Sequence, residues 1–323
     1  MFEQAVKSAA KQLRAGDVVV LPTETVYGLA ANAFDEKAVA KIFEIKGRPA
    51  HNPIIVHVVS LDMARSCVTA WPDLAEKLAR AFWPGPLTLV LPRAERIPSI
   101  VTAHGPTVGI RWPSHPLAQA IIRECGLPLA APSANPSNLL SPTTVEHVVK
   151  ALGDRVPLVI DGGQCQVGIE STVLDLTVSP PRVLRPGIIH DEALIAVTGT
   201  LSDRDAQQGQ AVKSPGMLAK HYAPRAKLMT LNWRNDRELR QQILNTSNSL
   251  AGCHVIAHSV IPSAEGFDRV SVIPHDPEAF ARALYAELHC CDELGAKVII
   301  VESLPKTSEW TGIADRLKRA SAT

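Results

Sequence analysis

The chain has 323 residues, of which 46% are apolar and 20% charged, and its formal net charge is +1. Its length favours two domains, and its composition is typical of a globular protein with a sizeable core. A net charge near zero excludes a global field that attracts nucleic acid or an anionic membrane, although a local basic groove is compatible with it.

The N-terminal segment carries charges throughout and places Phe2, Val6, Ala9 and Leu13 at helical spacing. This pattern predicts an amphipathic helix rather than a signal peptide. The apolar runs of the chain are all shorter than the ~18 residues that a membrane span needs. The six cysteines are scattered without a C-x-x-C pair, which argues against a disulfide framework or a structural zinc site. We therefore expect a cytoplasmic protein with no membrane segment.

Predicted strands and helices alternate along most of the chain. Strands are predicted at 18–21, 54–59, 87–91, 107–111, 127–131, 157–160, 171–176 and 182–185. Helices are predicted from the cap Asp35 to Lys46, from Asp73, from Pro116, and from Ser141-Pro142, where proline occupies the first turn. No helix separates the strands 87–91 and 107–111, so we expect a mixed rather than a purely parallel sheet.

The character of the sequence changes near residue 198. Residues 198–226 are polar and lack periodicity, so they predict a linker between one domain at 1–197 and another at 227–323. Four short strands and three helical stretches predict that the second domain is a smaller α/β unit. The linker ends in S-P-G-M-L-A-K-H-Y-A-P, and its apolar and aromatic residues indicate that this part docks onto the protein. They are Met217, Leu218, His221, Tyr222 and Pro224.

Common phosphate-binding and hydrolase motifs are absent from the sequence. It contains no G-x-x-x-x-G-K-[ST], no G-x-G-x-x-G after a strand, no G-x-S-x-G and no H-E-x-x-H. Side chains rather than a glycine loop would therefore hold any phosphate that the protein binds. Carboxylates are few near the strand ends, which disfavours a magnesium cage or a glycosidase pair.

Polar side chains nevertheless gather at five strand or helix ends, each with an ordinary explanation beside a functional one. Lys46 and Arg48 either complement a helix dipole or bind an anion. The serines and asparagines after 127–131 suit ordinary turns, and Ser141 suits a helix N-cap. Arg111 and Arg185 each end an apolar strand, where a charge needs water, a partner or an anion. Because ligands of open α/β sheets bind beyond strand ends, the five ends together favour a binding site.

Several motifs occur in the order found in a known family. They are P-T-E-T-V-Y-G-L, K-G-R-P…N-P-I-I-V-H, W-P-G-P-L-T, A-A-P-S-A-N, G-I-E-S-T-V and L-R-P-G. The chain thereby resembles the YrdC/YciO-type family, in the long form of L-threonylcarbamoyladenylate synthases, where S-P-G-M…K-H-Y-A-P leads into an extra C-terminal domain. The motifs cover residues 1–225, and the remainder agrees only in position and α/β character. The resemblance implies a twisted mixed α/β sheet with a concave basic face, followed by a smaller Rossmann-like α/β domain.

The resemblance also implies a reaction. The family makes threonylcarbamoyl-AMP and pyrophosphate from L-threonine, bicarbonate or CO2, and ATP with Mg2+, and no metal is expected on the protein's own side chains. Downstream tRNA threonylcarbamoyl transferase proteins then modify the adenosine 3′ of the anticodon in tRNAs that read codons beginning with A, and a contact with tRNA itself is left open. The chemistry needs positioning and charge stabilisation rather than a side-chain nucleophile, in agreement with the absence of a triad.

Carried over motif by motif, the resemblance assigns roles to individual residues. The K-x-R pair would be catalytic: Lys46 and Arg48. The residues that would hold threonine are Thr25, His57, Arg111, Ala131 (through its backbone) and Ser171. The residues that would contact ATP or the adenylate are Arg48, Asn52, Ser133, Asn135, Ser141, Arg185 and Tyr222. We expect Glu24 to support these residues, and the segment with Tyr222 to close over the site and exclude water.

Two rival functions are considered. A non-catalytic RNA-binding or ribosome-assembly module would use the basic face and bind RNA in a salt-sensitive way. The near-zero net charge and the 4% of aromatic residues count against it. Carbamoyl transfer in hydrogenase maturation uses a similar domain, but that architecture brings C-x-x-C zinc fingers, which this sequence lacks.

Overall fold

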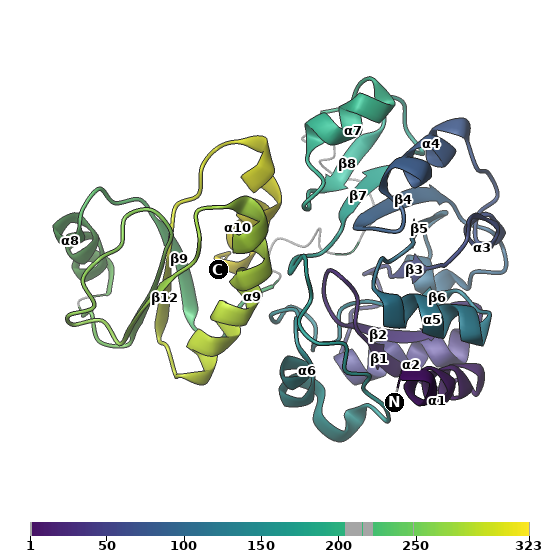
Figure 1. Ribbon diagram of the computed structural model, residues 1–323, viewed down its shortest axis with the longest axis horizontal. Coiled ribbons are helices and arrows are strands. Elements are labelled where there is room, and N and C mark those ends of the chain that lie inside the picture. Colours follow the sequence, from purple (N-terminus) through teal and green to yellow (C-terminus); the bar gives the residue numbers. More distant parts are fainter. Residues whose placement is uncertain (1, 204–214, 216–221, 248, 323) are drawn as a thin grey trace.

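The computed structural model describes residues 2–203, 215, 222–247 and 249–322. These residues form a larger α/β unit that ends near residue 203 and a smaller one that begins near residue 222, placed side by side (Figure 1). Three of the apolar residues predicted to dock at the end of the linker lie outside the described residues: Met217, Leu218 and His221.

The larger unit is built on an eight-stranded mixed sheet, which confirms the predicted fold class. Its strands are β1 (Val19–Leu21), β2 (Gly28–Asn32), β3 (Ile55–His57), β4 (Leu87–Pro92), β5 (Thr107–Arg111), β6 (Leu129–Ala130), β7 (Thr172–Asp175) and β8 (Arg182–Arg185). Their order is β1-β2-β6-β3-β5-β4-β7-β8. The pairs β3–β5 and β4–β7 are parallel, and the other ladders of this sheet are antiparallel.

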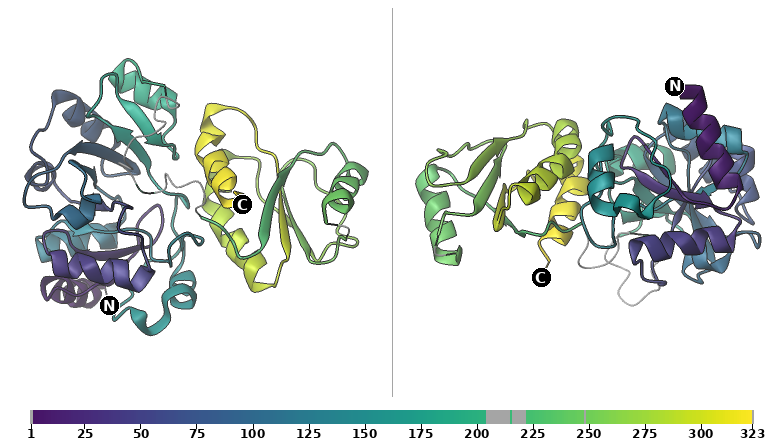
Figure 2. Two further views of the ribbon diagram at one scale, coloured as in Figure 1. Left: turned by 180° about the vertical axis from the view of Figure 1, so that it is seen from behind. Right: turned by 90° about the horizontal axis from the view of Figure 1, so that it is seen from below.

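Helices cover this sheet and bury its core. They are α1 (Phe2–Arg14), α2 (Glu36–Lys46), α3 (Leu61–Ser66), α4 (Asp73–Phe82), α5 (Pro116–Cys125), α6 (Val145–Leu152) and α7 (Asp191–Thr198), with 3-10 turns η1 (Ser99–Thr102) and η2 (Gly153–Arg155). Helices α1 and α5 lie side by side and share one apolar cluster with β1 and β6, whereas α2, α4, α6 and α7 contribute to a second, larger cluster (Figures 1 and 2).

Most predicted elements are present, and the exceptions have local causes. Helix α6 begins at Val145 with Thr144 as its N-cap, so the predicted start at Ser141-Pro142 is wrong. The hydroxyl of Ser141 is engaged elsewhere, by the carboxylate of Glu170 at 2.6 Å. The predicted strand 157–160 forms only an isolated bridge between Val159 and Val20. Strand β2 was not predicted, because its sequence G-L-A-A-N has no β-branched residue.

The smaller unit is an open parallel sheet with helices on both faces. Its strands are β9 (Lys227–Leu231), β10 (Cys253–Ala257), β11 (Arg269–Val272) and β12 (Val298–Glu302), in the order β11-β10-β12-β9. Its helices are α8 (Asp236–Ser247), α9 (Pro277–Glu293) and α10 (Thr311–Ala320), with a 3-10 turn η4 (Ser308–Trp310). The predicted second α/β unit is therefore present, and α9 and α10 lie on the face toward the larger unit (Figures 1 and 2).

The two units share an apolar core where they meet. Val26, Leu140 and Ile169 of the larger unit belong to the same buried cluster as residues of α9 and α10. Helix α10 approaches the larger unit to backbone contact, because a Cβ added at Gly312 would lie 2.5 Å from the carbonyl oxygen of Gly187. The contact is close-packed, so a shift of one unit directly displaces atoms of the other.

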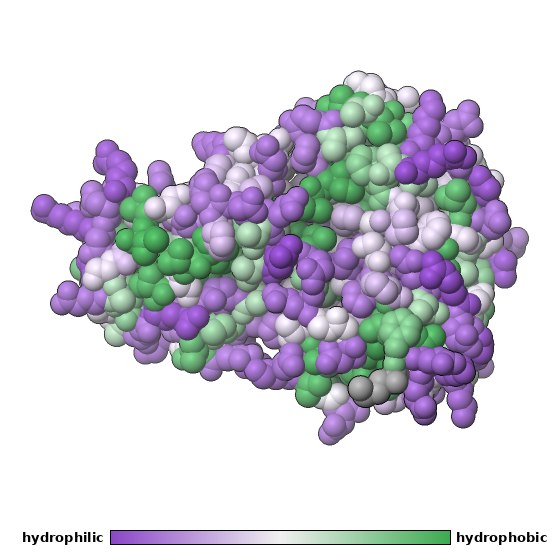
Figure 3. Space-filling view, viewed as in Figure 1, coloured by the Kyte–Doolittle hydropathy of each residue, from purple (hydrophilic) through white to green (hydrophobic). Residues whose placement is uncertain are grey.

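The surface is largely hydrophilic in the view of Figure 3, with apolar side chains in separate patches over both units. In the described part of the chain, no helix combines the length and apolarity that would let it cross a membrane.

Candidate active site

One pocket gathers the greater part of the predicted site. It is lined by Thr23, Thr25, Val26, Gly28, Arg48, Ile55, His57, Arg111, Ala131, Pro132, Ser133, Glu170, Arg185, Pro215 and Tyr222. The predicted residues on this wall are Thr25, Arg48, His57, Arg111, Ala131, Ser133, Arg185 and Tyr222. The predicted residues that do not line it are Lys46, Asn52, Asn135, Ser141 and Ser171, and each lies behind the wall with the contacts described below.

The sheet register explains why residues so far apart in sequence meet. His57 pairs with Arg111 across the parallel strands β3 and β5, so both strands end together. Strand β4 runs antiparallel to β5, so β4 starts where β5 ends. Strand β7 runs parallel to β4 and therefore starts at the same edge. Arg185 then pairs with Val173 at the end of β8. Three strand ends therefore deliver two arginines and a histidine to one edge of the sheet.

The loop between β1 and β2 presents two adjacent hydroxyls. Thr23 Oγ1 accepts hydrogen bonds from the backbone N–H groups of Thr25 and Val26, both at 3.2 Å, and donates to Val26 O at 2.6 Å. This turn fixes the Thr25 hydroxyl 2.9 Å from that of Thr23, and Thr25 is fully buried. The sequence P-T-E-T-V therefore forms a rigid polar wall rather than a flexible loop.

The glutamate of the same loop holds an arginine. Glu24 Oε1 lies 2.8 Å from Arg111 Nη2, and both side chains are almost fully buried. Neither Glu24 oxygen has a hydrogen-bond partner among the described residues, so this ion pair is what compensates the carboxylate. Burial, reinforced by the charge of Arg111, holds the pKa of His57 well below its usual range, and the imidazole is therefore neutral.

Small residues bring backbone to the pocket on the opposite side. Gly28 forms an isolated bridge with Ser133, and Leu29 N donates to Pro132 O at 2.8 Å. Ala131 N donates to Ile55 O at 3.0 Å. Gly28 and Ala131 are small residues on the wall, and close approach of a ligand to the main chain here stays a prediction.

Lys46 lies under the Ser133–Asn135 turn. Its Nζ donates to the carbonyl oxygens of Ser133 and Asn135, and its side chain is 3% exposed. Burial, and secondarily the charge of Arg48, holds the pKa of Lys46 well below its usual range. The lysine thus holds one wall of the pocket in place.

Arg48 reaches the pocket because α2 stops just before it. Gly47 caps the helix with a left-handed φ of 57° and turns the chain. The Arg48 guanidinium then donates to Asn52 O at 3.0 Å and to Pro53 O at 2.6 Å. Burial lowers the pKa of Arg48 to about 10, so the side chain stays charged at neutral pH. The amide of Asn52 is 1% exposed and has no hydrogen-bond partner among the described residues.

Arg185 is held from behind by Ser171. The backbone oxygen of Ser171 accepts from Arg185 Nε, and its hydroxyl accepts from Arg185 Nη2, both at 3.1 Å. Thr88 Oγ1 lies 2.8 Å from the Ser171 hydroxyl. The other side of the guanidinium faces the linker, where Nη1 donates to Pro215 O at 3.2 Å and to the Tyr222 hydroxyl at 3.5 Å.

Tyr222 is fixed over the pocket rather than exposed in a loop. It is 1% exposed and has a left-handed φ of 61°, which is unusual for an aromatic residue. The next residue, Ala223, bridges to Leu139 and donates its N–H to Asn138 O at 3.0 Å. In the described structure the end of the linker is therefore docked onto the loop that follows β6.

Two further predicted residues support this loop. The amide of Asn135 donates to Pro136 O at 3.0 Å and to Leu139 O at 2.8 Å. Ser141 donates to Glu170 Oε1 at 2.6 Å.

Glu170 and the residues that hold it were not among the predicted site residues. Glu170 lines the pocket, and Arg316 and Tyr285 of the smaller unit bind its carboxylate. The sequence does contain a sign of this contact. Arg316 lies on the apolar stripe of α10, three residues after Ile313 and next to Leu317. A charged residue at a core position requires a buried partner.

The composition of the site limits its chemistry. Three arginines line the pocket, and the glutamates at the site, Glu24 and Glu170, are each paired with an arginine, at 2.8 Å and 2.7 Å. In the ranges that the structure describes, no three His, Cys, Asp or Glu side chains are grouped so that they could hold a metal ion. The pocket is thus suited to bind anions and a short polar molecule rather than to form a covalent intermediate or a metal cage.

Comparison with known proteins identifies the family. Residues 11–187 match the Sua5/YciO/YrdC family model, described as telomere recombination. Residues 189–322 match the model described as threonylcarbamoyl-AMP synthase, C-terminal domain. A threonylcarbamoyl-AMP synthase of Pyrococcus abyssi is 39% identical over 99% of this chain and 94% of its own length. The chain belongs to the threonylcarbamoyl-AMP synthase family. The resemblance to the long form of this family is thereby confirmed.

Other relatives agree. A threonylcarbamoyl-AMP synthase of Bacillus subtilis is 39% identical over 98% of this chain and 92% of its own length. The crystal structure of P. abyssi Sua5 complexed with L-threonine superposes with a TM-score of 0.89 at 38% identity, covering 98% of this chain and 94% of that one. The E. coli YciO structure superposes with a TM-score of 0.52 at 26% identity and covers 58% of this chain and 91% of that one. The family's fold thus extends over both units of this chain.

Proposed function

We propose that this chain forms threonylcarbamoyl-AMP and pyrophosphate from L-threonine, bicarbonate or CO2, and ATP. Full-length relatives named threonylcarbamoyl-AMP synthase support the enzymatic function over a non-catalytic RNA-binding module. The observation that carries the proposal is that one pocket is lined by Thr25, His57 and Arg111 and also by Arg48 and Arg185. Arg48 and Arg185 both lie near Tyr222, and we refer to this part of the pocket as the cationic end.

Threonine would occupy the end of the pocket beside the P-T-E-T-V loop. The Arg111 guanidinium, held by Glu24 at 2.8 Å, would bind the substrate carboxylate. The buried hydroxyl of Thr25, neutral His57 and the backbone at Ala131 would bind its polar groups. The solved P. abyssi relative was crystallised with L-threonine, which supports a threonine site in this fold.

ATP would occupy the cationic end. Arg48, Ser133, Arg185 and Tyr222 line that part of the wall, and we propose that they contact the nucleotide. Asn52 lies behind the wall, but its buried amide has no hydrogen-bond partner among the described residues, so we keep it as a proposed contact of the bound nucleotide.

The remaining predicted residues would not touch the substrates but would hold residues of the pocket wall in position. Lys46 would fix the turn that carries Ser133, since its ammonium bonds the carbonyls there. Ser171 would orient Arg185 rather than touch threonine. Asn135 and Ser141 would hold the loop after β6 and the Glu170 carboxylate.

The reaction would proceed by positioning and charge stabilisation. The carbamate formed at the amine of threonine attacks the α-phosphorus of ATP through a carboxylate oxygen, and the bond from that phosphorus to the bridging oxygen of pyrophosphate breaks. The buried guanidiniums of Arg48 and Arg185 offset the negative charge that develops, and enclosure of the site keeps water from the labile product. Mg2+ would arrive with ATP and supply further charge on its phosphates. Both carboxylates at the site are already paired with arginines, so we assign no metal ligand to the protein.

The product would be consumed by a downstream tRNA threonylcarbamoyl transferase, in the cytoplasm. A direct contact between this chain and tRNA is compatible with the proposal but not required by it.

Pyrophosphate release tests the function. The full-length chain is assayed with ATP and Mg2+, with and without L-threonine and bicarbonate, and with L-serine as the control amino acid. We expect release to require both threonine and bicarbonate and to be faster with threonine than with serine. ATP turnover indifferent to threonine would overturn the proposed substrate, and absence of turnover in folded protein would favour the binding module.

A further inference from the structure

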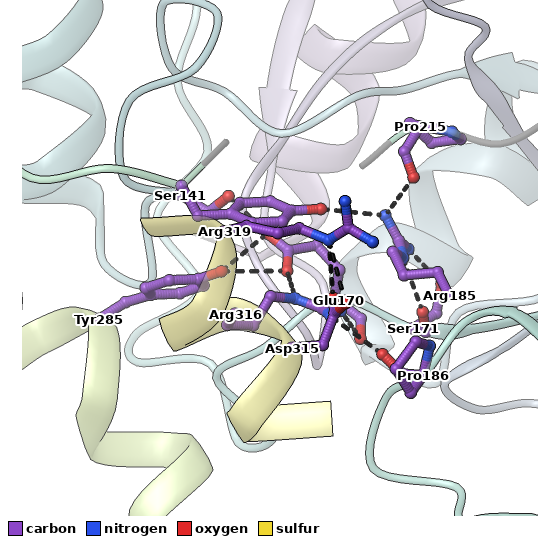
Figure 4. Close-up of polar contacts among 11 residues, drawn as sticks. Ser141, Glu170, Ser171, Arg185, Pro186, Pro215, Tyr285, Asp315, Arg316 and Arg319 are labelled. Atoms are coloured by element: carbon purple, nitrogen blue, oxygen red, sulfur yellow. Dashed lines mark hydrogen bonds and ion pairs between the residues drawn. The ribbon is translucent and has the colours of Figure 1, made fainter. Parts of the chain in front are cut away.

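The carboxylate of Glu170 lies where the pocket meets the smaller unit (Figure 4). Ser141 of the larger unit donates to Oε1 at 2.6 Å. Tyr285 of α9 donates to Oε2 at 3.2 Å, and Arg316 of α10 donates to the same oxygen at 2.7 Å. A residue of the pocket wall is therefore held mainly by the other unit.

All three guanidinium nitrogens of Arg316 donate hydrogen bonds. Its side chain is fully buried, and its Nη2 donates to Glu170 O at 3.1 Å. Its Nη1 donates to Pro186 O and to Asp315 Oδ2, both at 2.9 Å. This fork binds both the side chain and the backbone of Glu170, so the contact is specific in its geometry and differs from a chance ion pair at a surface.

The same cluster reaches the nucleotide end of the pocket. The Arg316 guanidinium lies 5.2 Å from the centre of the Tyr222 ring, and the Tyr285 ring centre lies 6.1 Å from that of Tyr222. Tyr222 in turn accepts a hydrogen bond from Arg185 at 3.5 Å. Arg316 therefore lies beside a second residue of the wall, Tyr222, which itself contacts Arg185.

An anionic ligand can bind beside Glu170 only if the negative charge of this carboxylate is offset, and Arg316 is its closest cation. An uncompensated buried carboxylate beside a triphosphate would repel it strongly in a low-dielectric site. Burial alone would raise the pKa of Glu170, but Arg316 and Arg185 outweigh it and hold that pKa below its usual range. The carboxylate is thus ionised, and Arg316 offsets its charge.

We propose that Arg316 and Tyr285 of the smaller unit are positioning residues of the nucleotide pocket, which neutralise and orient Glu170 so that ATP can bind beside it. The inference rests on the proposed function for the position of ATP. It gives the C-terminal unit a specific role, because this unit completes the electrostatics of a site that is built on the other unit.

Arg316→Gln in the full-length chain tests the inference. We expect the KM for ATP to rise about 10- to 100-fold, because a buried charge loses its partner, while the KM for threonine changes little. The double variant Arg316→Gln, Glu170→Gln should recover most of the affinity for ATP, since the repelling charge is gone.

In Arg316→Gln alone, Glu170 keeps Arg185, Ser141, Tyr222 and Tyr285 as neighbours but loses its closest cation. Its pKa then rises, and the KM for ATP should fall more steeply on acidification than the KM of the wild type does.

Lys318→Gln is the matched control, because Lys318 is a basic residue at an exposed position of the same helix. It should leave the KM for ATP unchanged. If Arg316→Gln melts too low to assay, Tyr285→Phe removes one hydrogen bond from Glu170 and should raise the KM for ATP severalfold. A merely structural role predicts equal losses for both substrates and no recovery in the double variant, and that result would overturn the inference.

Equilibrium dialysis with labelled ATP separates this inference from the proposed function. Wild-type protein that binds ATP but releases no pyrophosphate would refute the function, while weaker binding by Arg316→Gln would still support the inference. Equal binding of ATP by the wild type and Arg316→Gln, or no binding by either, would refute the inference.

Discussion

At the scale of single residues, the pocket is organised by arginines whose positions are fixed by other groups. Arg111 is held by Glu24, Arg185 by Ser171, and Arg48 by backbone carbonyls at Asn52 and Pro53. A guanidinium held in this way loses little conformational freedom when it binds a carboxylate or phosphate. Affinity therefore depends on the residues behind the arginines as much as on the arginines.

The pair of Glu24 and Arg111 gives a residue-scale prediction. Glu24→Gln removes the charge that holds Arg111, so we expect the KM for threonine to rise about tenfold, equivalent to about 1.4 kcal/mol, with the KM for ATP nearly unchanged. Glu44→Gln, at an exposed position of α2, is the matched control. Steady-state pyrophosphate release at varied threonine measures the effect. An unchanged KM for threonine in the folded variant would show that Glu24 does not position Arg111 for the substrate.

At the scale of elements, α6 and α9 meet through a stacked histidine pair. The rings of His147 and His289 are 3.9 Å apart between centres, with 17° between their planes. Lys150 of α6 and Glu293 of α9 form an ion pair beside them at 2.6 Å. Protonation of both imidazoles would place two like charges at the junction of the two units.

This contact predicts a pH dependence of stability. Burial, followed by the neighbouring His289, lowers the pKa of His147 to about 4, and burial also lowers the pKa of His289. Glu146, Lys150, Asp292 and Glu293 are the charged groups near the pair. In the unfolded chain histidine titrates near ~6.5, so between about pH 6.5 and 4 the unfolded state binds more protons than the folded state. Stability therefore falls as the pH falls through this window.

Thermal melts at pH 7.5 and 5 test this dependence. We expect the loss on acidification to include roughly 2 °C from this pair, because about 1 kcal/mol shifts the melting temperature by ~2–4 °C at 150–250 residues and by less in a longer chain. The double variant His147→Gln, His289→Gln should show a correspondingly smaller loss, whereas His51→Gln, at an exposed position, should behave as the wild type. An equal loss in the double variant and the wild type would contradict the prediction.

At the scale of the whole molecule, two units share one apolar core and one charged cluster beside the pocket. Removal of the smaller unit would expose Val26, Leu140 and Ile169 and leave the Glu170 carboxylate without Arg316. The eight-stranded sheet, by contrast, belongs wholly to the larger unit. We therefore expect the smaller unit to matter more for activity than for the fold of the larger one.

Truncation after Gly199 tests this division. We expect the truncated chain to keep the circular dichroism of a folded α/β protein, because the sheet and its two flanking clusters remain. Its kcat/KM for ATP should fall at least as far as in Arg316→Gln, since Tyr222 is lost as well. Full activity in the truncated chain would show that neither the linker nor the smaller unit contributes to the site.

The sequence predicted this fold well where local chemistry determines it. Asp35 caps α2 and Gly47 ends it, as the residue types indicate. The prediction failed where a tertiary contact overrides a local pattern: Ser141 has the chemistry of an N-cap, but its hydroxyl binds Glu170, which lies 29 positions further along the chain. Strand β2 is formed by small residues with weak strand propensity, and its pairing with β1 and β6 decides its structure.

The site was predictable only in part, for a related reason. Motifs named the residues that surround the pocket, such as Thr25 and Arg185, because each lies in a recognisable stretch. They did not separate residues on the wall from those behind it: Lys46 and Ser171 lie in the same stretches and turn away to hold neighbours. Arg316 was missed because its partner lies 146 positions away in the chain, a distance over which local patterns carry no information.

In the proposed reaction, this pocket joins a carbamoylated threonine to AMP. The most direct measurement incubates the full-length chain with ATP, Mg2+, L-threonine and carbon-13-labelled bicarbonate, and analyses the products by mass spectrometry. We expect a threonylcarbamoyl adenylate that carries one labelled carbon, formed in equal amount with pyrophosphate. Pyrophosphate accompanied only by AMP or by an unlabelled threonyl adenylate would contradict it.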